Sequence, residues 1–287
     1  MDLEQVSEKL TWINPLGGLG DSLMVSGVLK QVVELDPASK FNLVVRTKYP
    51  PILKGHPAIA RIGHPPPGSN IMGTDYWSME GFGRPDQRAY QVLAGMFGLK
   101  TPVEERLYVP WELEDDPILQ EFIPWQKTNI MICPSSNSPR KQMAEERWEY
   151  LVTRLRGDGA NVVQVGERSD RYIRGAYSLL GLTTPRQVVS LLRRFDAVLT
   201  SDNFLMHAAH LCGTRALVLW GPTDHRVYGY PHHVHMQSTP YERCADRCIG
   251  PGRGSVYTTE CLEDSAHCMN QLDMGAVYRA ACNVIDH

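Results

Sequence analysis

Polar side chains that could bind phosphate or hydroxyl groups occur where predicted strands give way to loops. The first such place is the stretch "GGLGDS" at residues 17–22, between a predicted strand and a predicted helix. Its glycines permit close approach to the backbone and leave helix-start amides available to an anion or a hydroxyl, although the spacing is not the dinucleotide fingerprint G-x-G-x-x-G. Asp21 is a candidate general base there, and its alternative role is to cap the helix. Gly18, Gly20 and Ser22 belong to the same loop.

A second group of polar side chains lies in "CPSSNSPRKQMAEERW", residues 133–148. Ser135 and Ser136 follow a predicted strand, and Lys141 precedes a predicted helix whose Trp148 we expect to face the core. Hydroxyl donors together with one ammonium suit the oxygens of a diphosphate. The alternative is a solvated loop without a ligand.

A third group lies in "TSDNFLMHAAHLCGTRALVLWGPTD", where Asp202 and Asn203 stand between a predicted strand and a predicted helix. The backbone of residues 204–206 opens that helix, and His207 follows in its first turns. This edge is where ligands bind in doubly wound sheets, although a histidine there can also be purely structural. Glu167 ends the predicted strand "NVVQVGE", where its carboxylate either accepts hydrogen bonds from ribose hydroxyls or lies on the surface.

Four cysteines near the carboxyl end form a separate group, spaced C-x3-C-x12-C-x6-C in a segment with few apolar residues. They are Cys244, Cys248, Cys261 and Cys268. Four thiolates on one tetrahedral zinc or iron ion would stabilise this segment without a chemical role. The alternatives are independent buried thiols or a pair of disulfides. The nearby "HHVH" could also bind a metal, but histidines beside a proline in a loop are more often exposed.

The elements that must position these groups alternate between short β-rich runs and helical patterns, in two series. A segment rich in Pro, Glu and Asp from Leu107 to Trp125 separates the series and is typical of a linker. The alternation predicts an α/β protein with parallel sheets, built as two Rossmann-like domains that face a central cleft. We place the domains at residues 1–125 and 126–287, with the cysteine-rich segment 244–268 inside the second.

Composition excludes several classes of protein. The 287 residues are 43% apolar and 21% charged, which is a globular composition. A formal charge of −3 does not favour nucleic-acid binding. The polar amino terminus does not resemble a secretory signal, and no run approaches the roughly 20 apolar residues that span a bilayer. We therefore expect a cytoplasmic protein, in which a disulfide framework would be unusual.

The three loop-bearing stretches, in this order along the chain, resemble glycosyltransferase family 9, the ADP-heptose heptosyltransferases of bacterial surface glycolipids. The resemblance implies a GT-B fold, in which the first domain binds the acceptor and the second binds the nucleotide sugar. It also implies inversion at the anomeric carbon without a catalytic divalent ion. ADP-heptose or another NDP-sugar would be the donor, and the acceptor would be a glycolipid, a protein or a small molecule.

The resemblance also implies roles for individual residues. Asp21 is similar to the family's catalytic base, and Asp202 to the aspartate that hydrogen-bonds the transferred sugar. Ser136 and Lys141 resemble the diphosphate contacts, with Lys141 neutralising the leaving group, and Glu167 resembles the ribose-binding acid. The residues that match the phosphate-binding turn and its histidine are Asn203, Phe204, Leu205 and His207.

The four-cysteine segment resembles that of the family subgroup that heptosylates bacterial autotransporter proteins and carries an iron-binding cysteine cluster. This similarity implies a protein acceptor or a homo-oligomer as one alternative. Peripheral membrane contact also stays open. Two other functions also stay open: a sugar-nucleotide epimerase or hydrolase with a GT-B fold, and a noncatalytic nucleotide-binding or scaffold subunit. The second is favoured by Phe204, which stands where the family commonly carries glycine, and by a first domain shorter than is typical of the family. The joint presence of Asp21, Lys141 and Asp202 argues against it, because a scaffold needs none of the three.

Overall fold

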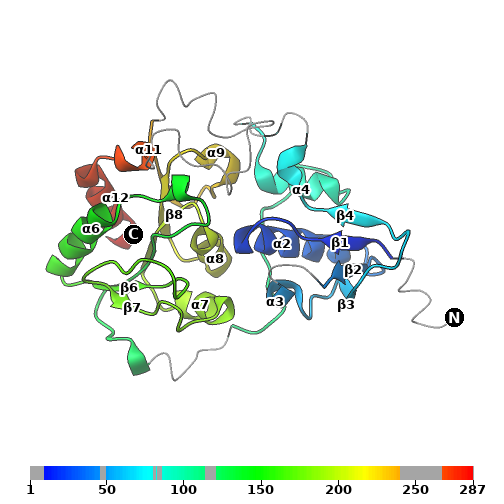
Figure 1. Cartoon of the computed structure of the whole chain (residues 1–287), viewed down its shortest axis with the longest axis horizontal. Coiled ribbons are helices and arrows are strands. Elements are labelled where there is room, and N and C mark those ends of the chain that lie inside the picture. The colour runs from blue at the N-terminus through cyan, green and yellow to red at the C-terminus, as the bar shows by residue number, and fades with distance from the viewer. Residues whose placement is uncertain are drawn as a thin grey trace. The chain divides into compact units, whose positions relative to one another are not determined.

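The chain divides into two compact units, Met1–Glu112 and Leu113–His287. The computed structural model describes residues 10–45, 50–79, 82, 86–113, 121–239 and 267–286. Each unit contains one sheet whose paired strands are all parallel, as the alternation of strands and helices predicts (Figure 1). The predicted linker overlaps the division between the units, and the roles assigned to the two domains remain proposals.

The first unit is built on a four-stranded sheet of order β3-β2-β1-β4. Its strands are β1 (Trp12–Asn14), β2 (Phe41–Val44), β3 (Ile59–Gly63) and β4 (Ile71–Gly73). The long helix α2 (Leu19–Leu35) packs against α3 (Pro50–Leu53) and α4 (Ala89–Met96). A Cβ at Gly27 would lie 2.0 Å from the carbonyl oxygen of Arg106, so a glycine in the middle of α2 permits this close approach.

The second unit contains a six-stranded sheet of order β10-β9-β8-β5-β6-β7. Its strands are β5 (Asn129–Cys133), β6 (Asn161–Gln164), β7 (Tyr177–Ser178), β8 (Ala197–Ser201), β9 (Ala216–Trp220) and β10 (Val234–Gln237). The α-helices in the described part of this unit include α6 (Glu145–Gly157), α7 (Pro185–Leu192), α8 (Phe204–Cys212), α9 (His225–Tyr228), α11 (His267–Asn270) and α12 (Met274–Asp286). Thr184 caps α7: its hydroxyl accepts a hydrogen bond from the Gln187 N–H.

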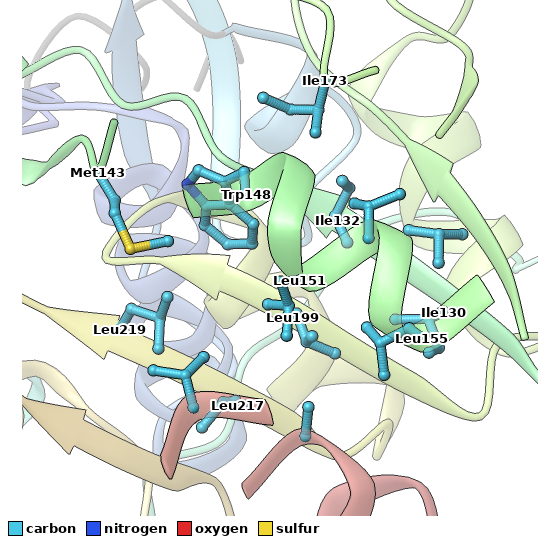
Figure 2. Packing of buried hydrophobic residues seen from close by; sticks show 14 of the residues in the cluster. Ile130, Ile132, Met143, Trp148, Leu151, Leu155, Ile173, Leu199, Leu217 and Leu219 are labelled. Atoms are coloured by element: carbon cyan, nitrogen blue, oxygen red, sulfur yellow. The ribbon is translucent and has the colours of Figure 1, made fainter. Parts of the chain in front are cut away.

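The core of the second unit lies between the sheet and the helices α6 and α12, which pack against each other (Figure 1). Trp148 on α6 is completely buried, as expected from the sequence, and lies beside Met143 in this core (Figure 2). Leu199 from β8 and Leu217 from β9 face the same layer (Figure 2). Because the central strands are covered on both faces, they read as continuous apolar runs in the sequence.

The "HHVH" segment differs from its expected loop conformation. It leads into β10, which pairs with β9, and only His232 is exposed. His233 is buried, with its Nε2 3.3 Å from the Met206 carbonyl oxygen. The spacing of the three histidines does not indicate a strand. The strand forms because the backbone of β10 pairs with β9. None of the helices within the described ranges is both long enough and apolar enough to cross a membrane.

Candidate functional site

In the first unit, Asp21 occupies the first turn of α2 and both of its carboxylate oxygens accept hydrogen bonds. Oδ2 accepts from the Gly18 N–H at 2.6 Å. Gly18 is the N-cap of α2, so Asp21 caps the helix from its third residue and does not open it. Oδ1 accepts from the Tyr76 hydroxyl, also at 2.6 Å. Tyr76 begins the short 3-10 helix η1 (Tyr76–Ser78) and is 3% exposed. The carboxylate is therefore held in one orientation by two segments of the chain.

The sheet brings these two segments together because β1 and β4 are parallel neighbours. Their following loops therefore leave the same edge of the sheet. The Leu16 N–H donates to the Thr74 hydroxyl at 2.9 Å, which ties the loops to each other before Asp21 is reached. Gly17 has a φ of +91°, and a Cβ there would lie 2.3 Å from Asp21 Oδ2. Glycine is thus needed both for the backbone conformation and for room beside the carboxylate.

In the second unit, Lys141 and Asp202 form a largely buried ion pair. Lys141 Nζ lies 2.7 Å from Asp202 Oδ2, and the Thr223 hydroxyl donates to the same oxygen at 2.7 Å. The three residues come from the loops that follow β5, β8 and β9, which are neighbours in the sheet. Burial by itself opposes ionisation of Asp202, but the Lys141 ammonium and the two hydrogen bonds outweigh it and lower the pKa of the carboxyl.

Asn203 fastens the start of α8 to the loop after β5. Its Oδ1 accepts from the Leu205 N–H at 2.9 Å, and its Nδ2 donates to the carbonyl oxygens of Cys133 and Ser135 at 2.9 and 2.8 Å. The Thr200 hydroxyl lies 2.8 Å from Asn203 Oδ1. The side chain therefore acts as a helix cap and as a link between two strand ends. While it caps the helix, the Leu205 N–H is already engaged.

The other predicted diphosphate contact, Ser136, lies in the loop that leads to the 3-10 helix η2 (Pro139–Lys141). Its carbonyl oxygen accepts from Gln142 Nε2 at 2.6 Å, and its Oγ accepts weakly from the Ser138 N–H at 3.4 Å. These bonds shape the loop around Lys141.

Phe204 is the first residue of α8, and its side chain is half-buried.

His207 is buried on α8, and its Nδ1 lies 2.7 Å from the hydroxyl of Tyr230. Burial lowers the pKa of His207 to about 4, despite the opposing charge of Asp202. The imidazole is therefore neutral at pH 7 and supplies no positive charge to a phosphate. Its contact with Tyr230 joins α8 to the segment between α9 and β10.

Glu167 follows β6, whose carboxyl end lies on the same edge of the sheet as the Asp202 loop. Its side chain is exposed, and its backbone N–H donates to Asp170 Oδ2 at 2.8 Å. The structure thus groups Lys141 with Asp202 directly and places Glu167 farther along the edge, beyond β5.

The sequence matches glycosyltransferase family 9 (heptosyltransferase) over residues 87–247, more than half of the chain. This chain belongs to glycosyltransferase family 9. It is therefore a glycosyltransferase with an α/β fold of the GT-B type. No curated protein sequence matches it.

Three solved structures that are similar to this chain in fold share little sequence with it. A family 9 glycosyltransferase from Veillonella parvula DSM 2008 is 14% identical, with a TM-score of 0.64 over 96% of this chain and 97% of that one. The E. coli ADP-heptose LPS heptosyltransferase II has the same identity and TM-score, over 96% and 98% of the two chains. The iron-containing dodecameric glycosyltransferase TibC from enterotoxigenic E. coli H10407 is 13% identical, with a TM-score of 0.72 over 96% and 76%.

Thr223 and Tyr76 are not among the predicted site residues, yet Thr223 contacts Asp202 and Tyr76 contacts Asp21. Thr223 lies in "WGPTD" just after a predicted strand, so the rule that placed Asp202 at the sheet edge could also have found it. Tyr76 lies in "TDYWSME", where no periodicity or glycine pattern marks it. Its contact with Asp21 depends on the pairing of β1 with β4.

The predicted metal site cannot be built from the described part of the family 9 chain. Cys244, Cys248 and Cys261 lie outside the described residues. Cys268 is half-buried in α11. Within the described ranges, no three His, Cys, Asp or Glu side chains are grouped as metal ligands. A structural zinc or iron ion bound by the four cysteines therefore stays a prediction.

Proposed function

We propose that this chain transfers a sugar, in the first instance heptose from ADP-heptose, to an acceptor hydroxyl with inversion at the anomeric carbon. The Lys141–Asp202 pair carries this proposal, because it places a cation and a carboxylate together at the carboxyl edge of a parallel sheet. This edge is where nucleotides bind in folds of this type. Membership of family 9 supports the same class of reaction.

Asp202 and Lys141 can bind the donor without separating. The Lys141 and Thr223 contacts both fall on Asp202 Oδ2, and the second oxygen of the carboxylate is then the acceptor for a sugar hydroxyl. An ammonium has three N–H donors, so Lys141 can contact a phosphate oxygen while it remains bonded to Asp202. In this proposal Asp202 orients both the sugar and the cation.

The diphosphate would also be met by the hydroxyls of Ser135 and Ser136 and by the start of α8. A helix amino terminus favours an anion through its amides and its dipole. Because Asn203 Oδ1 engages the Leu205 N–H, we assign the phosphate contact to the amides of Phe204 and Met206. Glu167 would accept from the ribose hydroxyls, and neutral His207 would hold α8 in place through Tyr230.

The acceptor side of the reaction is assigned to Asp21. The carboxylate would take the proton from the acceptor hydroxyl as that oxygen bonds to the anomeric carbon. The bond from this carbon to the diphosphate oxygen breaks on the opposite face, and the electron pair leaves with the nucleoside diphosphate. Lys141 stabilises the negative charge that grows on the departing diphosphate. Such prearranged electrostatic stabilisation is usually the largest contribution to catalysis. No step requires a divalent ion.

Release of ADP from ADP-heptose, measured with and without an acceptor, tests this function. The acceptors are a truncated lipopolysaccharide core, an autotransporter passenger domain and a panel of small sugars. We expect acceptor-dependent release in the wild type and a loss of at least about 100-fold in Asp21→Asn, as for removal of a general base. Release without acceptor would instead support a hydrolase, and no release from any of several NDP-sugars would support a noncatalytic subunit.

Calorimetric titration with ADP separates donor binding from chemistry. Asp21→Asn should bind ADP like the wild type, whereas Lys141→Met should bind about tenfold more weakly or worse because it lacks a charge-assisted phosphate contact. Lys141→Arg, which keeps the cation, is the matched control and should lose less affinity. Equal ADP affinity in Lys141→Met and the wild type would contradict the phosphate role of Lys141.

A further inference from the structure

The phenol of Tyr76 makes a direct contact with the carboxylate assigned as the base. We propose that Tyr76 is a positioning residue for Asp21: it keeps the carboxylate ionised and turned in one direction. This inference rests on the proposed function of Asp21, but the contact itself is a feature of the structure. It adds a residue that no sequence pattern indicated.

The geometry restrains Asp21 from two sides. The Tyr76 hydroxyl donates to Oδ1 and the Gly18 N–H donates to Oδ2, each at 2.6 Å. Rotation of the carboxylate about its Cβ–Cγ bond would break both hydrogen bonds. Each oxygen carries two lone pairs, so an oxygen that accepts one of these bonds can still accept a proton from another direction.

Tyr76 itself has little freedom to move. Its ring contacts the rings of Trp77 and Phe82 edge-on, with centroids 5.0 and 5.3 Å away. Its backbone N–H donates to the Thr74 carbonyl oxygen at 2.9 Å, and Thr74 in turn accepts from the Leu16 N–H through its hydroxyl. The phenol is thus fixed relative to the loop that carries Asp21.

The hydrogen bond also has an electrostatic effect. A phenol that donates to a carboxylate stabilises the ionised form, and short bonds to a charged oxygen are the strong ones. The amino terminus of α2 acts in the same direction. Asp75, next to Tyr76 in the chain, is a second carboxylate, and its Oδ2 accepts from the Ser78 hydroxyl at 2.9 Å. Without the phenol, Asp21 should ionise at a higher pH and rotate more freely.

The test compares Tyr76→Phe with Tyr90→Phe in the full chain. Tyr90 is the matched control because it is a second buried tyrosine of the first unit, and its hydroxyl donates to the Arg106 carbonyl oxygen and accepts from Gln31 Nε2. Titration of the aspartate carboxyl carbons by NMR needs no acceptor, and the Asp21 signal is the one lost in Asp21→Asn. The pH profile of acceptor-dependent ADP release is the second measurement.

We expect Tyr76→Phe to raise the midpoint of the Asp21 titration by about one pH unit, the shift that loss of one hydrogen bond to a charged group would produce. The acid limb of kcat/KM should move by the same amount, while Tyr90→Phe moves neither. A midpoint unmoved in Tyr76→Phe, or moved equally in Tyr90→Phe, would overturn the role of Tyr76. Full turnover in Asp21→Asn would instead overturn the base assignment, whatever the NMR titration shows.

Discussion

Lys141 Nζ lies 2.7 Å from Asp202 Oδ2, and the two side chains are only 13% and 8% exposed. A pair buried to this degree is not a typical surface salt bridge, because both ions have lost most of their water. Each member depends on the other for its charge to be tolerated. The pair therefore links the stability of the second unit to the residues that we propose bind the donor.

Lys141→Met should lower the free energy of unfolding by about 3 kcal/mol at pH 7, because it leaves a buried carboxylate without its cation. Adding Asp202→Asn to Lys141→Met removes the uncompensated charge and should recover part of the loss. Denaturant unfolding of the two variants and the wild type measures both effects. A double variant no more stable than Lys141→Met would show that the charge of Asp202 is not the source of the loss.

Gly17→Ala should displace the Asp21 carboxylate, since the new Cβ would lie 2.3 Å from Oδ2 in a backbone with a φ of +91°. We expect a loss of about 1–2 kcal/mol in stability and a larger loss of turnover than of ADP affinity. Gly18→Ala is the control: its φ is −98°, and its Cβ would lie 3.6 Å from the same oxygen. Thermal unfolding and ADP release would be measured for both. Similar behaviour of the two variants would contradict the steric argument.

Acid should destabilise the first unit partly through His56. Burial lowers the pKa of this histidine to about 4, whereas an unfolded histidine titrates near 6.5. The stabilising contribution is therefore fully present above about pH 6.5 and is lost as the pH falls towards about 4, at roughly 1.4 kcal/mol per pH unit. His56→Asn should lower the slope of stability against pH by about this amount in denaturant unfolding experiments between pH 4 and 6.5, while buried His207 keeps its own contribution. The exposed His64→Asn should keep the full slope, and an unchanged slope in His56→Asn would refute the prediction.

Metal analysis tests the four-cysteine prediction. Protein purified without chelators should contain a stoichiometric amount of iron or zinc, and Cys248→Ser should lose it together with thermal stability. Cys212→Ser should retain the metal, because Cys212 donates to the Val189 carbonyl oxygen and burial raises the pKa of its thiol to about 12. Elemental analysis that finds no metal in wild-type protein would exclude the site.

Much of the fold could be predicted because buried parallel strands are continuous apolar runs and the helices carry recognisable ends. Thr184 before α7 is such an end: threonine is a favoured cap, and Gln187 three residues later completes a capping box. The short strand β4 and the edge strand β10 could not be predicted in this way. Three residues of β4 offer no periodicity, and only the last two residues of "HHVH" belong to β10, through pairing with β9.

The candidate site could be predicted only where its residues share a local context. Asp202 stands at the end of an apolar run, which the sequence shows directly. The sequence does not indicate the ion pair with Lys141, because only the adjacency of β5 and β8 in the sheet brings the two loops together. Tyr76 lies 55 residues from Asp21 in the chain, and only the order of strands in the first sheet brings them together.

Asn203 touches two carbonyl oxygens of one loop and one amide of the next helix, so the proposed nucleotide pocket is assembled when the chain folds. The entropy of ordering these loops is then lost once, during folding, and not again with each donor molecule. A pocket set in advance also has little freedom to reshape itself around a different nucleotide. We therefore expect a narrow donor range, and Asn203→Gly should widen it at the expense of affinity.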